Sequence, residues 1–363
     1  MKRITILSLL LLMILTSFAQ KTINLSGTWD FQIDRNGSYN ASQKYDDTIK
    51  LPGSMLTNGK GDLPSIDTKW TGSLYDSSYY YNPYMEKYRH TSSMKFPFFL
   101  TPEHYYVGYA WYRHNAEIPR MWKKNRVILF LERPHIETTI FVNGKEVGHQ
   151  MSLSVPHEYD ITDYVKFGKN NSIAIKIYNG IENVGVGQDS HSVTDQTQGN
   201  WNGIVGKIEL RSQKSIFTVK TFPDLTTGNV KVLVNDKEYN LKIDNPQPWS
   251  EFTPILYTRS IVYRGDTIPV TFGFRNIEVK GRDIMLNGKP IYIRGTVENC
   301  NFPLTGYPPT DVESWKKIIQ KCKDYGINTM RFHSYCPPEA AFIAADSLGF
   351  YLQPEGPSWP NHG

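Results

Sequence analysis

The sequence predicts a multidomain chain that is β-sheet at first and becomes α/β after Arg282. Before that point, short runs of alternating apolar and polar residues are broken by Gly, Asn, Asp and Pro, and helical periodicity is nearly absent. After it, the pattern changes to strand, loop, helix and strand, which is typical of a parallel sheet with crossover helices. The chain has 363 residues, of which 39% are hydrophobic and 21% charged, so it can bury more than one core.

The first segment, residues 24–210, has the pattern of an antiparallel β-sandwich. Asn143 and Gly144 predict a tight hairpin turn inside it, because both residue types tolerate a positive φ. The expected strands are residues 27–33, 110–118, 126–132, 138–142, 172–178 and 205–210. A second segment, residues 214–275, repeats the strand-and-turn pattern and predicts a reduced sandwich or a linking sheet.

The last segment predicts two helices between three strands. Residues 311–325 form the clearer helix, with Thr310 as N-cap, Glu313 completing a capping box and Gly326 ending the helix. The other expected elements are strands at residues 291–294, 327–332 and 350–353 and a helix at residues 338–347. A closed (β/α)8 barrel takes about 250 residues, of which this segment supplies about a third. We therefore expect the chain to be a fragment of a longer protein.

The first nineteen residues have the features of a secretory signal peptide. Lys2 and Arg3 precede an apolar run at residues 4–15, and small residues at Ser17 and Ala19 suit cleavage before Gln20. An apolar run this short would hardly span a bilayer as a permanent anchor. We expect a secreted or periplasmic protein without a membrane anchor.

Charge and cysteine content argue against several other classes. The formal net charge of +5 is spread along the chain and forms no basic block for nucleic-acid phosphates. Cys300, Cys322 and Cys336 fit neither a disulfide framework nor a zinc-ligand spacing. The glycines of residues 185–187 lack the strand-then-helix setting of a phosphate-binding loop. We predict no nucleic-acid partner and no cofactor, and the oligomeric state stays open.

A series of motifs along the chain resembles glycoside hydrolase family 2. In the first segment the motifs are residues 25–31, 108–113, 141–148, 159–164 and 202–205. At the joint, residues 272–278, 286–291 and 294–295 resemble the family's passage into its catalytic barrel. After the signal peptide (1–19), the resemblance implies a jelly-roll-like sugar-binding sandwich (20–212), a reduced immunoglobulin-like sandwich (213–280) and the start of a TIM barrel (281–363).

The resemblance implies an enzyme that releases terminal β-linked sugars from oligosaccharides or polysaccharide-derived substrates, with retention of configuration. That reaction uses two carboxyl groups about 5–5.5 Å apart, one as acid and one as nucleophile. In the family these are glutamates at the ends of barrel strands four and seven, so the resemblance places both beyond Gly363. A β-galactosidase-like activity is expected, and the fragment alone should be inactive.

Other functions stay open at this point. The family also includes β-glucuronidases, β-mannosidases and α-arabinosidases. A non-catalytic carbohydrate-binding or scaffold module is a further alternative, although an unfinished barrel would leave strand edges and apolar faces exposed.

The candidate substrate-binding residues follow the predicted barrel strands, whose carboxyl ends face the active site in such barrels. The resemblance points to five of them, namely Glu298, Asn299, Arg331, His333 and Glu355. Two more complete the set. Trp359 could stack on a sugar ring, and Asp195 lies in a polar loop from which some family members reach the pocket.

Several of these residues have a structural alternative. Arg331 could be tied to a carboxylate inside the barrel, Glu355 could orient other residues, and Trp359 could pack in its proline-rich loop. His333 could be a buried histidine with satisfied hydrogen bonds. His362 lies near the family's magnesium-binding histidine, but the acidic neighbour is missing, so we predict no metal.

Overall fold

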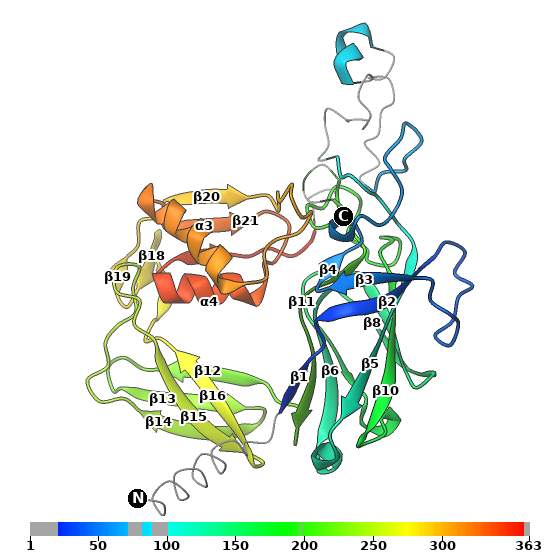
Figure 1. Cartoon of the computed structure of the whole chain (residues 1–363). Coiled ribbons are helices and arrows are strands. Elements are labelled where there is room, and N and C mark those ends of the chain that lie inside the picture. The colour runs from blue at the N-terminus through cyan, green and yellow to red at the C-terminus, as the bar shows by residue number, and fades with distance from the viewer. Residues whose placement is uncertain (1–20, 72–81, 89–100, 196, 198, 359–363) are drawn as a thin grey trace, which may run out of the picture.

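The computed structural model describes residues 21–71, 82–88, 101–195, 197 and 199–358. The predicted signal peptide, Trp359 and His362 lie outside the described residues. Figure 1 shows a large β-sandwich beside an α/β segment, with a smaller pair of sheets below the α/β segment.

The sandwich consists of two antiparallel sheets. Its strands are β1 (Thr22–Asn24), β2 (Gly27–Asp34), β3 (Asp47–Leu51), β4 (Gly53–Ser54), β5 (Tyr109–Ile118), β6 (Arg126–His135), β7 (Glu137–Val142), β8 (Lys145–Met151), β9 (His157–Asp160), β10 (Lys169–Tyr178) and β11 (Gly203–Gln213). One sheet has the order β1-β11-β6-β9, with β4 beside β11, and the other has the order β3-β2-β5-β10-β7-β8. Short 3-10 turns connect them, namely η1 (Leu56–Asn58), η2 (Pro83–Tyr88), η3 (Arg120–Lys124) and η4 (Thr162–Tyr164).

The alternating pattern of the sandwich strands comes from a shared core. Trp29, Tyr112, Leu129 and Ile175 are buried between the two sheets, while the intervening residues face outward. The predicted hairpin between β7 and β8 is confirmed, because Asn143 and Gly144 adopt φ values of 52° and 80° at its turn.

A smaller pair of antiparallel sheets follows the sandwich. Its strands are β12 (Val219–Pro223), β13 (Asn229–Val234), β14 (Lys237–Lys242), β15 (Tyr257–Tyr263) and β16 (Asp266–Phe272). The sheets β12-β13-β14 and β15-β16 share one apolar core that contains Val232, Ile261 and Phe272. The short strands β17 (Ile277–Lys280), β18 (Asp283–Leu286) and β19 (Lys289–Pro290) form a separate sheet that leads to the α/β segment.

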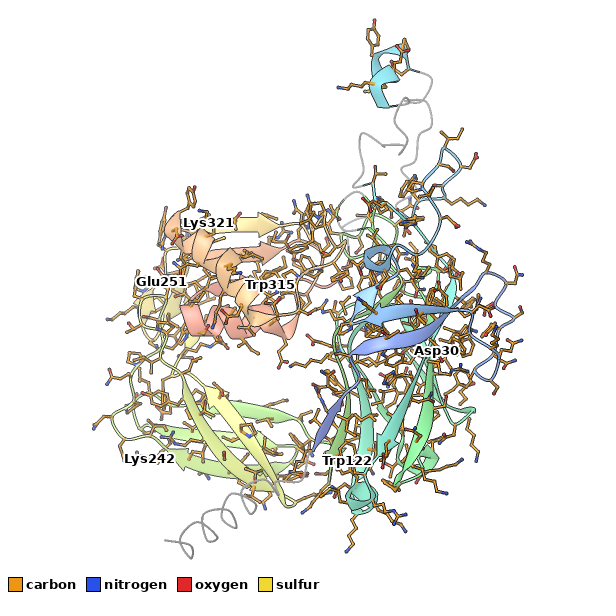
Figure 2. The ribbon with its side chains drawn as sticks, in the orientation of Figure 1. Asp30, Trp122, Lys242, Glu251, Trp315 and Lys321 are labelled. Carbon is orange, nitrogen blue, oxygen red and sulfur yellow. The ribbon has the colours of Figure 1, made fainter. Side chains whose placement is uncertain are left out.

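The α/β segment contains a parallel sheet with the order β20-β21-β22. Its elements are β20 (Gly295–Glu298), α3 (Val312–Asp324), β21 (Thr329–Phe332), α4 (Glu339–Leu348) and β22 (Tyr351–Gln353). Met330 and Phe332 are buried with residues of both helices, and the Phe332 and Trp315 rings lie 5.8 Å apart in this core. Figure 2 labels Trp315 on α3. Both helices therefore cover the same face of the sheet.

The opposite face of the parallel sheet is open. Val297 is 50% exposed, and Gln353, which shares its face, is exposed as well. Within the described part of the chain, the outer edges of β20 and β22 pair with no further strand. Parallel sheets are normally covered on both faces, so this sheet has unpaired polar backbone and apolar surface that another element would stabilise.

The predicted first strand of this sheet was misplaced. Residues 291–294 form no strand, and β20 begins at Gly295, which pairs with Thr329. The side chain of Asn328 holds the Arg294 backbone N–H at 2.8 Å, and the Arg294 carbonyl accepts from the Asn328 N–H at 2.9 Å. The apolar run that suggested a strand is a connecting segment, in which Tyr292 is 78% exposed.

The joint between the small sheets and the α/β segment is polar and specific. Both carboxylate oxygens of Glu251 are used, by Arg294 at 3.1 Å and by Asn328 at 2.7 Å. Lys323 donates to the Glu251 carbonyl at 2.8 Å, and the Trp249 indole donates to the Asp346 carbonyl at 2.8 Å. Figure 2 places Glu251 beside the α/β segment. These contacts fix the amino-terminal end of the parallel sheet.

The N-cap of α3 also differs from the prediction. Asp311 is the N-cap, because its carboxylate accepts a hydrogen bond from the Ser314 N–H at 2.8 Å. Aspartate is a strong N-cap residue, and its negative charge suits the positive end of the helix dipole. Thr310 lies one residue earlier.

Replacing the cap residue tests this assignment. Asp311→Ala should lower the free energy of unfolding by about 1 kcal/mol, because a helix N–H loses its acceptor. Thr310→Ala is the matched control and should change it by less than about 0.5 kcal/mol. Chemical denaturation of both variants measures the difference, and a larger loss at Thr310 would restore the original prediction.

Candidate functional site

Arg331 lies on the open face of the parallel sheet. It is the third residue of β21 and pairs with Val297 on one side and Gln353 on the other. Side chains alternate along a strand, so Arg331 points away from the helices that cover Met330 and Phe332. Its side chain is 39% exposed.

Glu355 holds the end of β21 in place. Its Oε1 accepts from Arg331 Nε, and its Oε2 accepts from the Ser334 backbone N–H at 2.9 Å. His333 Nδ1 lies 3.7 Å from the same Oε2. Partial burial favours a higher pKa for Glu355, but the bonds from Arg331 and Ser334 outweigh it and lower the pKa. The Glu355 carboxyl therefore stays ionised and holds the Arg331 side chain and the Ser334 backbone in place.

Ser334 occupies a backbone conformation that serine rarely adopts. Its φ is 59°, and the residue is buried directly after the strand end. Its N–H donates to Glu355, and its carbonyl accepts from Ser192 Oγ at 2.7 Å. Its own Oγ lies 3.2 Å from His333 Nδ1. Two partners from distant parts of the chain thus hold this turn, which sets the direction of His333.

The sandwich contributes two residues to this cluster that the sequence analysis did not name. Ser192 binds the Ser334 carbonyl, and the His191 ring lies 4.3 Å from the His333 ring. Burial lowers the pKa of His191, and the nearby His333 and Arg331 lower it further. The polar character of the loop at residues 187–202 is a sequence feature that could have identified His191 and Ser192, but Asp195 was selected from this loop instead.

Asp195 is more deeply buried than His191 and Ser192. It is 1% exposed, and its Oδ1 accepts from the Asn200 backbone N–H at 3.4 Å. Burial raises the pKa of Tyr105, and the negative charge of Asp195 raises it further. The structure thus brings Arg331, His333 and Glu355 together, and it places Asp195 beside Asn200 and Tyr105.

Glu298 and Asn299 stand at the end of β20. Glu298 is the last residue of the strand and pairs with Phe332, so it lies on the face that the helices cover. Its carboxyl oxygens accept from the Cys300 N–H at 3.1 Å and the Asn301 N–H at 3.3 Å. Burial raises the pKa of Glu298 to about 7, against the effect of these two bonds. Asn299 is exposed.

Two further findings apply to the residues that the structure describes. They contain no group of three or more His, Cys, Asp or Glu side chains that could hold a metal ion. Among them, no helix has both the length and the apolar character needed to cross a bilayer.

The sequence model for the sugar-binding domain of the family 2 glycosyl hydrolases matches residues 22–214, which is more than half of the chain. The chain belongs to glycoside hydrolase family 2. The resemblance found in its motifs is therefore confirmed, and the matched residues correspond to the β-sandwich.

Curated relatives of this family 2 chain include enzymes of two specificities. A β-galactosidase of Thermoanaerobacter pseudethanolicus is 24% identical over 74% of this chain and 42% of its own length. The β-galactosidase large subunit of Latilactobacillus sakei is 25% identical over 94% of this chain and 59% of its own length. A putative β-glucuronidase of Formosa agariphila is 24% identical over 68% of this chain and 27% of its own length. The chain thus spans between about a quarter and three fifths of these proteins.

Solved structures show the same fold. A family 2 member from Bacteroides cellulosilyticus matches with a TM-score of 0.67 and 19% identity, over 93% of this chain and 46% of its own. A β-glucuronidase from Ruminococcus gnavus, solved in complex with D-glucaro-d-lactam, matches with a TM-score of 0.68 and 18% identity, over 93% of this chain and 59% of its own.

The raised pKa of Glu298 predicts a pH effect on stability. A carboxyl whose pKa is higher in the folded state stabilises the fold at low pH, and this contribution is lost as pH rises through the folded value. The free energy of unfolding should therefore fall by about 3 kcal/mol between pH 4 and pH 8 on account of this group.

Glu298→Gln should remove that part of the pH dependence, because glutamine keeps the neutral shape at every pH. Glu313→Gln, at an exposed glutamate of α3, is the matched control and should leave the pH profile unchanged. The free energy of unfolding of the wild type and of both variants, measured between pH 4 and pH 8, tests this prediction. Equal profiles for wild type and Glu298→Gln would contradict the buried state of this carboxyl.

Proposed function

We propose that this chain is the amino-terminal part of an exported, retaining family 2 glycosidase that releases terminal β-linked galactose-type sugars. The observation that carries the proposal is the cluster of Arg331, His333 and Glu355 at the carboxyl end of an open parallel sheet. In barrels of βα units the substrate binds at this end of the strands.

The open face and unpaired edges of the sheet support the barrel. Further βα units would pair with the edges of β20 and β22 and would enclose the face that carries Arg331. The chain covers only part of its relatives' length, which agrees with such units following in the complete protein.

The state of Arg331 favours a neutral sugar over a uronic acid. Its positive charge is already compensated by Glu355, so a substrate carboxylate would gain less from it than from an unpaired arginine. The remaining N–H groups of the guanidinium can still donate to sugar hydroxyls. His333 is held beside them and can do the same.

Neither Glu298 nor Glu355 is placed to act as the acid or the nucleophile that breaks the glycosidic bond. Both oxygens of Glu355 accept hydrogen bonds from Arg331 and Ser334, and both oxygens of Glu298 accept from backbone N–H groups. The acid and the nucleophile of the retaining reaction are proposed to come from later barrel strands. The basic and apolar amino terminus supports export.

The proposed activity is tested with chromogenic substrates. The full-length protein should hydrolyse a β-galactoside faster than the matching β-glucuronide, β-mannoside and α-arabinoside, and the 363-residue chain alone should hydrolyse none. A dominant β-glucuronidase activity would overturn the sugar assignment. Turnover by the 363-residue chain would overturn the placement of the catalytic glutamates, and a full-length protein that hydrolyses no glycoside would support a binding module.

The strand-end cluster is tested in the same assay. Arg331→Gln and His333→Gln should each lower kcat/KM about 10- to 100-fold, because a buried hydrogen bond to the sugar is lost. Arg259→Gln, on the exposed side of β15, is the matched control and should leave kcat/KM unchanged. Wild-type kcat/KM in both cluster variants would show that the sugar binds elsewhere.

A further inference from the structure

Two side chains of the sandwich donate to the turn that follows β21. Ser192 Oγ donates to the Ser334 carbonyl at 2.7 Å, and Arg133 Nη2 donates to the Cys336 carbonyl at 2.7 Å. Ser192 and Ser334 are both buried, so the bond between them is shielded from water. Arg133 lies on β6, whereas Ser192 belongs to the loop between β10 and β11. Two separate parts of the sandwich thus bind the same turn, residues 333–336.

The loop that carries Ser192 is itself anchored in the sandwich. The Ser190 carbonyl accepts from the Val193 N–H at 3.0 Å and from the Thr194 N–H at 2.8 Å. Val193 is fully buried and belongs to a small apolar cluster with Ile136. Ser192 therefore has a fixed position from which its hydroxyl reaches the α/β segment.

The bond from Ser192 acts on a backbone conformation that serine does not favour. At a φ of 59°, the Ser334 N–H donates to Glu355 Oε2 at 2.9 Å while the Ser334 carbonyl accepts from Ser192. A negative φ would rotate these two groups relative to each other, so both bonds could not be made together. Such a conformation persists only where its surroundings determine it. Without the Ser192 hydroxyl, the buried Ser334 carbonyl would lose its donor and the turn would relax.

The same turn determines where the His333 ring lies. The His333 backbone N–H donates to the Glu298 carbonyl at 2.9 Å, which holds the residue on its strand side. On the other side, the next peptide is held through Ser334. The ring itself has Ser334 Oγ 3.2 Å from its Nδ1 and the His191 ring 4.3 Å away. A change in the Ser334 backbone would therefore change the direction of the His333 imidazole.

We propose that Ser192 is a positioning residue of the glycosidase, whose hydroxyl fixes the Ser334 turn and thereby directs His333 toward the sugar. This inference rests on the proposed function, in which His333 donates to a sugar hydroxyl. A contact that only joined the sandwich to the α/β segment would not depend on His333. The acceptor of the Ser192 bond is the residue directly after His333, and a misplacement of about 1 Å in a substrate-binding group lowers activity up to about 100-fold.

A double-mutant cycle in the full-length protein tests this role. Ser192→Ala should lower kcat/KM for the chromogenic β-galactoside about 10-fold, because His333 loses its direction. In the His333→Gln background the same change should lower kcat/KM less than about twofold, because the group through which Ser192 acts is missing. Equal losses in both backgrounds, or a Ser192→Ala variant with wild-type kcat/KM, would overturn the positioning role alone. Wild-type kcat/KM in His333→Gln would overturn the proposed sugar contact and this inference with it.

Ser212→Ala is the matched control. Ser212 is a buried serine of β11, and its hydroxyl accepts from Asn125 Nδ2 at 2.8 Å. Like Ser192→Ala, this variant loses one buried hydrogen bond of the sandwich, but it should leave kcat/KM unchanged in both backgrounds. A comparable loss of kcat/KM in Ser212→Ala would show that activity follows the stability of the sandwich, and the proposal would fail.

Crystal structures of the full-length wild type and of Ser192→Ala provide a second readout that needs no turnover. In Ser192→Ala, Ser334 should leave the left-handed region, and the His333 ring should move away from the His191 ring. Ser212→Ala should keep both features. An unchanged turn in Ser192→Ala would overturn the positioning role, whether or not the full-length protein hydrolyses a glycoside.

Discussion

Among the residues that the structure describes, helices cover the parallel sheet β20-β21-β22 on one face only, and this constraint shapes the whole α/β segment. Met330 and Phe332 are buried against α3 and α4, whereas Val297, Arg331 and Gln353 lie on the face without helices. A parallel sheet in water needs cover on both faces, so the exposed face is either completed by further strands or used as a surface. A closed barrel does both, because its interior is enclosed while its strand ends stay accessible.

The strand-end cluster is assembled from parts of the chain that are far apart in sequence. Glu355 follows β22, Ser334 follows β21, and Ser192 belongs to a loop of the sandwich. Together they hold a serine at a φ of 59°, and backbone strain of this kind persists only where several contacts determine it. The sandwich thus acts as part of the site's support, in addition to having a core of its own.

Local pattern predicted most strands of the sandwich and most elements of the α/β segment, but it misplaced the first strand of the parallel sheet. Alternation and the Asn143-Gly144 turn are properties of neighbouring residues, so β7 and β8 could be found from sequence. The start of β20 depends on Asn328, which binds the Arg294 backbone from 34 positions away. The role of Ser192 depends on a contact that spans 142 positions, and no short motif signals it. For the same reason, Arg331 and Glu355 could be proposed as neighbours only through the family resemblance.

The most direct test of this account is a crystal structure of the full-length protein with a sugar-ring inhibitor bound. The account predicts additional parallel strands beside β20 and β22, and a sugar ring that receives hydrogen bonds from Arg331 or His333 on the enclosed face. A sheet that ends at these three strands, or a sugar bound away from Arg331, His333 and Glu355, would contradict it.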